Sequence, residues 1–221
     1  MERKVIAELL DDDLGTPEEI AESLVDLRHI NNWFGGTATT TQLLRRIAGA
    51  TGQARLSLLE IGAGLGDVPL EACRALAKDG IQLRVTLLDR LWSHLPHSEV
   101  SAVSGDAKHL PFHDGAFDVV SCSLLAHHFE PDDLSQLAKE ALRVCSKAVL
   151  VNDLIRSRVH LALVYLGLPL FRSRITWHDA PASVRRAYTR EEMQSMLADL
   201  PAKRIETTTH YFYRMGILLW K

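Results

Sequence analysis

Three glycines lie between an apolar run and a helical pattern in Leu58–Asp67, which reads LLEIGAGLGD. These glycines are Gly62, Gly64 and Gly66. Glycines at a strand-to-helix turn allow the backbone to approach a ligand closely. In open α/β folds such a turn lies at the carboxyl edge of the sheet, where cofactors bind. We therefore expect this segment to form part of a cofactor site.

The charges around the glycines indicate which ligand the turn accepts. A dinucleotide fingerprint requires glycine at its first, third and sixth positions, which here are Gly62, Gly64 and Asp67. A carboxylate at the helix start would repel a pyrophosphate by roughly 1–4 kcal/mol at effective dielectrics of 80 to 20. Glu60 adds a second negative charge. The segment therefore favours a ligand with positive charge and disfavours a phosphate.

Two further acids end the next two predicted strands. Asp89 closes the second strand, about 20 residues beyond the glycines, a spacing suited to binding ribose hydroxyls. Asp106, in the sequence Ser-Gly-Asp-Ala, ends the third strand. Turn formation and helix capping are the structural explanation for any one of these acids. Their joint occurrence at consecutive strand ends favours a shared site.

The set of motifs resembles that of class I S-adenosylmethionine-dependent methyltransferases. The resemblance extends over roughly residues 55 to 155. The segments that carry it are Glu60–Gly66, the strand-end Asp89, Gly105–Ala107 and Phe117–Val120. It implies a seven-stranded, mostly parallel Rossmann-like sheet with helices on both faces and an antiparallel terminal strand. It also implies S-adenosyl-L-methionine as the cofactor.

The resemblance also implies a role for each matching residue. The methionine part of the cofactor would face the glycine loop, with the two nearby acids close to its amino group: Gly62, Ala63, Gly64 and Gly66, then Glu60 and Asp67. The ribose would be held by the end of the second strand, Asp89 with Arg90, and the adenine by Gly105, Asp106 and Ala107. The end of the fourth strand would lie under the reactive methyl group: Ser121, Cys122 and Ser123.

The acceptor is expected to be a small molecule. Leu110–Asp118 resembles a signature of the small-molecule branch of the family, which includes quinone-biosynthesis enzymes. The fourth strand ends without the Asn/Asp-Pro-Pro-aromatic sequence of enzymes that methylate base amines or glutamine amides. Lys and Arg number 25 against 28 Asp and Glu, a net charge of −3, so no basic surface for nucleic acid is expected.

Two adjacent histidines are the candidate catalytic residues. His127 and His128 follow the fourth predicted strand, and a histidine titrates near neutral pH, so either can take a proton from a hydroxyl acceptor. We favour His128; packing within the loop is the alternative, and acceptor positioning without a base is also open. No metal site is expected, because no second ligand set has helical spacing, and His109 and His113 straddle Pro111 in a predicted loop.

Two flanking segments are expected to enclose the acceptor. Arg28–Gly36 has aromatic residues before two glycines, which suggests a lid over the cofactor; an ordinary helix end is the alternative. We expect Arg28 to meet the carboxylate of the cofactor. Leu161–Phe171 is apolar and suggests a wall, or else a buried helix. Four arginines flank it: Arg156, Arg158, Arg172 and Arg174. This combination favours a lipophilic phenol, quinol or polyketide, with O-methylation favoured over C-methylation.

These residues require alternating strands and helices to position them. Short apolar runs predict the strands Leu56–Ile61, Leu83–Leu88, Val100–Val103, Phe117–Ser121 and Ala148–Val151. Helical patterns fall at Asp67–Lys78 and Asp132–Val144, and capping boxes begin helices after Thr16 and Thr189. Lys203–Trp220 predicts a terminal hairpin that turns near Tyr213-Arg214.

The 221 residues predict one methyltransferase domain, 1–221. Within it we expect a helical lid or extension over 1–50, a cofactor-binding core over 51–155, and an acceptor-pocket insertion with the terminal strands over 156–221. Three scattered cysteines, no secretory leader and no apolar run long enough to cross a bilayer predict a cytoplasmic protein without integral membrane association. The oligomeric state is left open.

Two other functional classes share the predicted sheet. A nicotinamide-dependent oxidoreductase would bind at the same edge, but Asp67 opposes its pyrophosphate. A non-catalytic S-adenosylmethionine-binding protein would keep the glycine loop and lack a productive acceptor pocket. The methyltransferase is the preferred interpretation.

Overall fold

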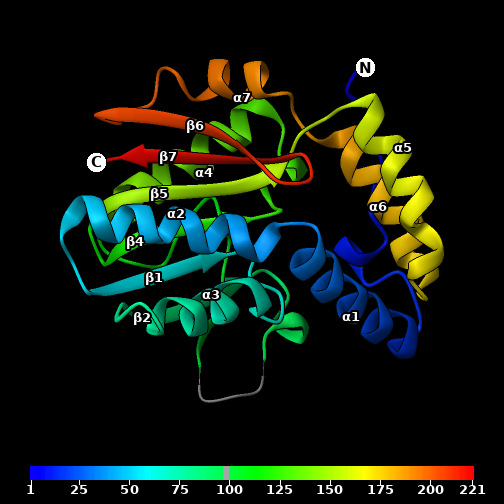
Figure 1. Cartoon of the computed structure of the whole chain (residues 1–221), viewed down its shortest axis with the longest axis horizontal. Helices are drawn as coiled ribbons and strands as arrows, with labels where there is room; N and C mark the ends of the chain where they lie inside the picture. Colours follow the sequence, from blue (N-terminus) through cyan, green and yellow to red (C-terminus); the bar gives the residue numbers. More distant parts are fainter. Residues whose placement is uncertain (97–99) are drawn as a thin grey trace.

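A seven-stranded sheet in the order β3-β2-β1-β4-β5-β7-β6 forms the centre of the computed structural model, which describes residues 1–96 and 100–221 (Figure 1). Neighbours among β1 to β5 are parallel, whereas β7 is antiparallel to both β5 and β6. The predicted fold class is confirmed, including the reversed strand of the terminal hairpin. The strands are β1 Arg55–Ile61, β2 Gln82–Asp89, β3 Ser101–Ser104, β4 Phe117–Ser123, β5 Cys145–Leu154, β6 Arg204–His210 and β7 Arg214–Trp220.

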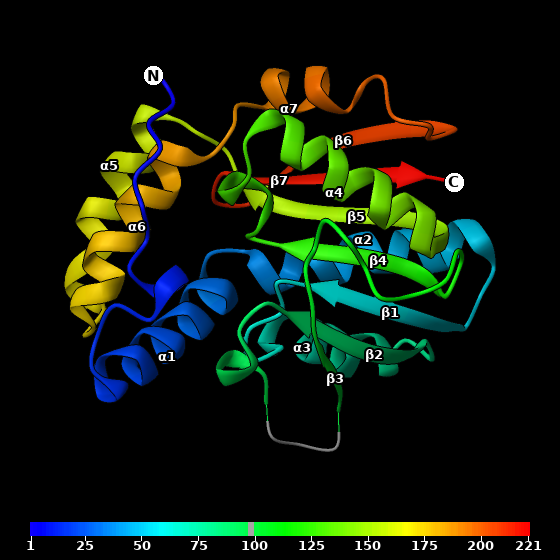
Figure 2. The same ribbon diagram turned by 180° about the vertical axis from the view of Figure 1, so that it is seen from behind.

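Helices cover both faces of the sheet, which explains why its central strands are nearly continuous apolar runs. In β1, Leu58 packs with the cluster that includes α2 and α3, whereas Leu59 and Ile61 pack with the cluster that includes α4 and α7. Figures 1 and 2 show these two layers from opposite sides. The helices are α1 Pro17–Trp33, α2 Gly36–Thr51, α3 Asp67–Ala77, α4 Pro131–Val144, α5 Arg158–Gly167, α6 Arg174–Arg186 and α7 Arg190–Leu197.

Three helices, α1, α5 and α6, lie together beyond the carboxyl ends of the parallel strands (Figures 1 and 2). Among the described residues, four short 3₁₀ turns complete the fold: η1 Leu10–Asp12, η2 Trp92–His94, η3 Ala126–His128 and η4 Leu168–Leu170. In the described part of the chain, no helix combines the length and apolar character needed to cross a bilayer.

The predicted helix starts at Thr16 and Thr189 are confirmed. Each threonine accepts a hydrogen bond from the backbone of the glutamate three residues later, and each glutamate side chain accepts one in return. The segment expected over Leu161–Phe171 divides: α5 ends at Gly167 and a 3₁₀ turn follows. Helix α6 was not predicted, because Pro181 in its interior is a local signal against a helix.

The amino-terminal segment, residues 1–14, runs alongside α6 (Figure 2). The Lys4 N–H donates to the Arg185 carbonyl at 3.0 Å. Farther along, the N–H groups of Leu9 and Leu10 donate to the two carboxylate oxygens of Asp179, at 2.9 and 3.0 Å. These bonds hold the segment at the carboxyl edge of the sheet.

A buried carboxylate also joins α1 to α6. Asp26 accepts hydrogen bonds from the backbone N–H groups of Arg172 and Ser173, at 3.2 and 3.0 Å. Ser173 is itself the N-cap of α6, and its hydroxyl donates to the Glu19 carbonyl. Because the Ser173 N–H is buried and the Arg172 N–H is partly buried, both depend on this carboxylate as their acceptor.

Asp26→Ala is therefore expected to lower the free energy of unfolding by about 1–3 kcal/mol, because one buried and one partly buried donor lose a charged acceptor. Urea unfolding followed by circular dichroism measures this change. Glu22→Ala, at an exposed position of the same helix, is the control and is expected to stay within about 0.5 kcal/mol of the parent. Equal stabilities of the two variants would contradict the role assigned to Asp26.

Candidate active site

A cavity of about 680 Å³ opens at the carboxyl edge of the sheet. Its walls include the glycine loop after β1, the ends of β2 and β3, and the turn after β4. Residues of α1, α5 and α6 and of the amino-terminal segment complete it. The cavity thus connects the predicted cofactor residues with the predicted acceptor wall.

Two glycines at the start of the loop have positive φ angles. At Gly62, φ is +64°, and a Cβ would lie 2.7 Å from Leu125 Cδ1. At Gly64, φ is +50°, and a Cβ would meet no other atom within 4 Å. A larger residue at Gly62 would be strained in backbone and packing. The space beside Gly64 remains open, which leaves the backbone there accessible to a ligand.

Asp89 joins the ends of β1 and β2. Its Oδ2 accepts the Gly64 N–H at 2.9 Å, and its Oδ1 accepts the Leu91 N–H at 3.0 Å. The backbone strengthens the link, because the Ala63 N–H donates to the Leu88 carbonyl and the Gly105 N–H to the Asp89 carbonyl, both at 3.0 Å. The carboxylate therefore holds the glycine loop and lines the cavity at the same time.

Glu60 lies almost completely buried in the cavity wall. Its Oε2 has no hydrogen-bond partner among the described residues. Burial disfavours the charged form and raises the pKa of Glu60 to about 7. A positively charged group placed beside this carboxyl would stabilise its ionised form.

Two predicted arginines pair with protein groups at the cavity. Arg28 Nε donates to Asp67 Oδ1 at 2.8 Å, which ties α1 to the start of α3. Arg90 Nη2 donates to the Asp11 carbonyl at 2.9 Å and lies 3.5 Å from Asp12 Oδ1. Both arginines line the cavity and also position the amino-terminal region over it.

Most of the remaining predicted cofactor residues also line the cavity, namely Gly105, Asp106, Ala107 and Ser123. Asp106 is exposed and accepts from the Lys108 N–H at 2.9 Å; this bond and the contact with His109 lower its pKa. Cys122 is buried among the apolar side chains of one sheet face and does not line the cavity. Gly66 is likewise absent from the lining and makes the turn into α3.

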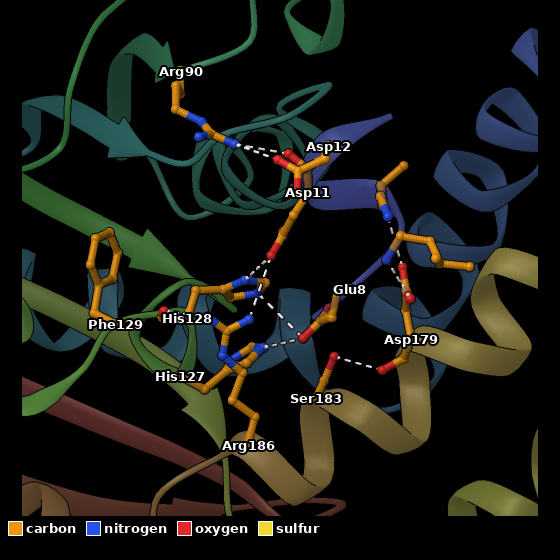
Figure 3. Close-up of polar contacts among 12 residues, drawn as sticks. Glu8, Asp11, Asp12, Arg90, His127, His128, Phe129, Asp179, Ser183 and Arg186 are labelled. Carbon is orange, nitrogen blue, oxygen red and sulfur yellow. Dashed lines mark hydrogen bonds and ion pairs between the residues drawn. The ribbon is translucent and has the colours of Figure 1, made fainter. Parts of the chain in front are cut away.

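The two predicted catalytic histidines lie side by side on η3, with ring centroids 4.3 Å apart (Figure 3). His127 is buried, and its Nδ1 lies 2.6 Å from Asp153 Oδ1. The His127 backbone N–H also donates to Asp153 Oδ2 at 2.9 Å. His128 is more exposed, and its Nδ1 lies 2.9 Å from Asp11 Oδ2.

Glu8 and Asp11 were not predicted to belong to the site. Glu8 Oε1 lies 3.7 Å from His127 Nε2 and 3.8 Å from His128 Nε2 (Figure 3). Burial opposes charge on His127, but Asp153 and Glu8 together raise its pKa to about 10. No local pattern identifies these acids, because only the path of residues 1–14 along α6 brings them to the histidines.

The acceptor side of the cavity is mainly apolar. Phe34 lies there against Phe171 and Phe212, whereas Trp33 is exposed and stacks on His29. Other lining residues come from α1, α5, η4 and α6: Leu24, Leu27, Ile30, Leu163, Val164, Leu168 and Val184. The segment around Phe34 therefore contributes to the wall.

Sequence reasoning missed Arg214, a cationic residue in this wall. It is buried, and its Nη1 has no partner among the described residues, while Nε donates to the Phe34 carbonyl at 3.2 Å. Burial lowers its pKa to about 10. The four arginines expected to flank the acceptor, Arg156, Arg158, Arg172 and Arg174, do not line the cavity in the described structure. Arg156 and Arg174 instead pair with Glu192 and Glu19.

Comparison with known proteins agrees with this geometry. Residues 59–151 match the family model described as a methyltransferase domain. The plantazolicin methyltransferase BpumL, solved with a monoazolic desmethyl-plantazolicin analogue and SAH, is similar in fold, with a TM-score of 0.70 at 13% identity over 97% of this chain and 94% of that one. A SAM-dependent methyltransferase from Aquifex aeolicus gives a TM-score of 0.58 at 13% identity over 81% and 87% of the two chains. Comparison with curated proteins gave no match.

Because the pKa of Glu60 is raised, the difference in folding stability between the parent protein and Glu60→Gln is expected to depend on pH. Because the folded state retains a proton that the unfolded state releases above its pKa of about 4.5, this group costs stability as pH rises from about 4.5 to 7. Glu60→Gln is expected to gain about 2–3 kcal/mol relative to the parent across this interval. Urea unfolding of both proteins at pH 5 and pH 8 measures the difference. If the free energies of unfolding of the two proteins differed equally at both pH values, the effect assigned to the burial of Glu60 would be contradicted.

Proposed function

Because the chain is an enzyme with a methyltransferase domain, we propose that it transfers the methyl group of S-adenosylmethionine to an oxygen atom of a small, largely apolar acceptor. Phenols, quinols and polyketides are the acceptor classes that fit. The observation that carries this proposal is the cavity itself. It runs from the glycine loop and Asp89 to the apolar wall of α1, α5 and α6, with a cluster of imidazoles and carboxylates in its lining.

The residues at the strand ends fit S-adenosylmethionine. Glu60 presents a buried carboxyl oxygen without a partner, which suits the ammonium or sulfonium of this cofactor. The open space at Gly64 gives the ligand access to the backbone. When bound, the cofactor supplies an electrophilic methyl group. Carboxylates around the turn, Glu60 and Asp67 among them, oppose the diphosphate of a nicotinamide cofactor instead.

The role proposed for each cofactor-binding residue depends on the donors and acceptors that it has left after its bonds within the protein are counted. Each oxygen of Asp89 already accepts one backbone N–H and retains a lone pair, so both can still accept from ribose hydroxyls. Arg28 uses Nε for Asp67 and keeps other N–H groups for the cofactor carboxylate. Asp106 and Ala107, at the end of β3, are assigned to the adenine.

The acceptor is assigned to the space bounded by Phe34, Phe171 and Phe212, where apolar contact favours a ring or alkyl chain. Arg214 offers a buried N–H donor at this wall, which suits an electron-rich polar group on an otherwise apolar molecule. The positive charge of Arg214 supports a lipophilic acceptor with a polar head. This charge comes from Arg214 and not from any of the four arginines expected from the sequence.

Positioning is the main task of the enzyme in an in-line displacement at a methyl carbon. The cavity walls hold the acceptor and limit its contact with water. A hydroxyl acceptor must also lose a proton. The group formed by His127, His128, Glu8 and Asp11 is the part of the lining able to receive or to direct that proton. Its position in the same cavity favours oxygen over carbon as the methylated atom.

Asp89→Ala is expected to weaken the binding of S-adenosylhomocysteine by about 10- to 100-fold, the equivalent of a lost charge-assisted hydrogen bond of about 1.5–3 kcal/mol. Isothermal titration calorimetry measures the affinity, and a thermal melt checks that the variant is folded. Asp199→Ala, at an exposed position next to α7, is the control and should bind like the parent. Unchanged affinity in Asp89→Ala would refute its role.

The proposed reaction is tested by incubating the enzyme with S-adenosylmethionine that carries an isotopically labelled methyl group and a panel of phenols, quinols and polyketides. Mass spectrometry is expected to find labelled methyl ethers with an equal amount of S-adenosylhomocysteine. Label on carbon would overturn the choice of oxygen. Binding of the cofactor without a labelled product from any member of the panel would count against these acceptor classes.

A further inference from the structure

Three potential metal ligands meet at one place on the cavity wall. Glu8 Oε1 lies 3.7 Å from His127 Nε2 and 3.8 Å from His128 Nε2, and the three ligand atoms all lie within 4.8 Å of one another. Glu8 and His127 are buried, and His128 is partly buried. Figure 3 shows the three side chains pointing toward a common centre from the amino-terminal segment and from η3.

Two of these atoms lack any hydrogen-bond partner. Within the described part of the chain, Glu8 Oε1 and His127 Nε2 are buried and unsatisfied. Neither a lysine nor an arginine of the described residues forms an ion pair with Glu8. By contrast, Asp11 has Arg186 at 3.5 Å. A buried polar atom without a partner costs free energy, so this geometry calls for a cation between the carboxylate and the imidazoles.

The other nitrogen of each imidazole is held by a carboxylate. His127 Nδ1 lies 2.6 Å from Asp153 Oδ1, and His128 Nδ1 lies 2.9 Å from Asp11 Oδ2. In protein metal sites, a ligating histidine almost always donates its second N–H to such a group, which sets the tautomer and the ring orientation. In the neutral tautomer that donates Nδ1–H to its carboxylate, each Nε2 faces Glu8 with a lone pair available. A metal ion that binds here therefore displaces the second proton of His127.

We propose that Glu8, His127 and His128 form a site for a divalent transition-metal ion, with Zn²⁺ the best match. Two imidazole nitrogens and one carboxylate oxygen are a ligand set typical of catalytic zinc. Bonds of about 2.0–2.2 Å place tetrahedral ligand atoms roughly 3.3–3.6 Å apart, so Glu8 Oε1 must approach each Nε2 by a few tenths of an ångström. Three protein ligands leave a further coordination position, and all three residues line the cavity.

The role of the ion rests on the proposed function, although its binding does not. An acceptor hydroxyl that enters the open position forms an oxygen–metal bond and releases its proton to solvent, because coordination lowers the pKa of the hydroxyl. The oxygen keeps the electron pair that attacks the methyl carbon. The ion would thus select acceptors with a hydroxyl group and would favour methylation at oxygen.

The test begins with the full-length protein, stripped with a chelator and titrated with ZnCl₂ in equilibrium dialysis without methyl donor or acceptor. We expect one Zn²⁺ per chain. Glu8→Gln, which keeps the shape of the side chain and removes its charge, is expected to weaken binding by about 10- to 100-fold or more. His94→Gln is the matched control, because His94 also pairs with a carboxylate at the cavity wall, Asp13 at 2.7 Å, but has no second histidine beside it.

Absence of stoichiometric Zn²⁺ in the parent would overturn the proposal, and so would equal binding by the parent and Glu8→Gln. In either case the cluster is an ion pair only. A measurement on the unmodified protein guards against a variant that fails to fold. Co²⁺ bound at the site should give the visible absorption bands of a four- or five-coordinate ion, and added Zn²⁺ should abolish them. Spectra of free, six-coordinate Co²⁺ would contradict the site.

These measurements separate the metal site from the methyltransferase reaction. Methyl ether formation that persists in chelator-treated enzyme without Zn²⁺ would overturn the role of the ion and leave the proposed function standing. Stoichiometric Zn²⁺ in a protein that methylates no hydroxyl acceptor would support the site and count against the proposed reaction.

Discussion

The contact of Asp89 with the glycine loop is the interaction on which the organisation of the site depends. One carboxylate accepts the N–H groups of Gly64 and Leu91 and so joins the ends of β1 and β2. A parallel sheet brings these strand ends to one edge, but their loops need a shared acceptor to take one conformation. Because Asp89 also lines the cavity, the group that orders the loop has remaining lone pairs to offer to a ligand.

The amino-terminal segment completes the cavity from the opposite side. Asp179 on α6 accepts the N–H groups of Leu9 and Leu10, and Arg90 binds the Asp11 carbonyl. These contacts place Glu8 and Asp11 against the two histidines. A segment with little secondary structure thus contributes two of the acids at the site. The sheet supplies the cofactor half, and the added helices and this segment supply the acceptor half.

Local signals explain why much of the fold was predictable. The strands of the core, the capping boxes at Thr16 and Thr189 and the terminal hairpin each depend on residues close in sequence. Prediction was weaker for α6, where Pro181 conflicts with the helix, and for the arginines around the acceptor. The arginine missed at the acceptor wall is Arg214, at the start of β7, whose burial follows from packing against α1 and not from its neighbours in sequence.

The sequence by itself determined the strand-and-helix order, the glycine turn and the acids at the strand ends, because each of these is encoded within a few adjacent residues. It also indicated the histidine pair. Only the tertiary structure decided what those histidines contact. Asp153 comes from β5, and Glu8 and Asp11 come from the amino-terminal segment. Contacts between residues so distant along the chain depend on how separate elements pack, and no local pattern of residue types encodes that packing.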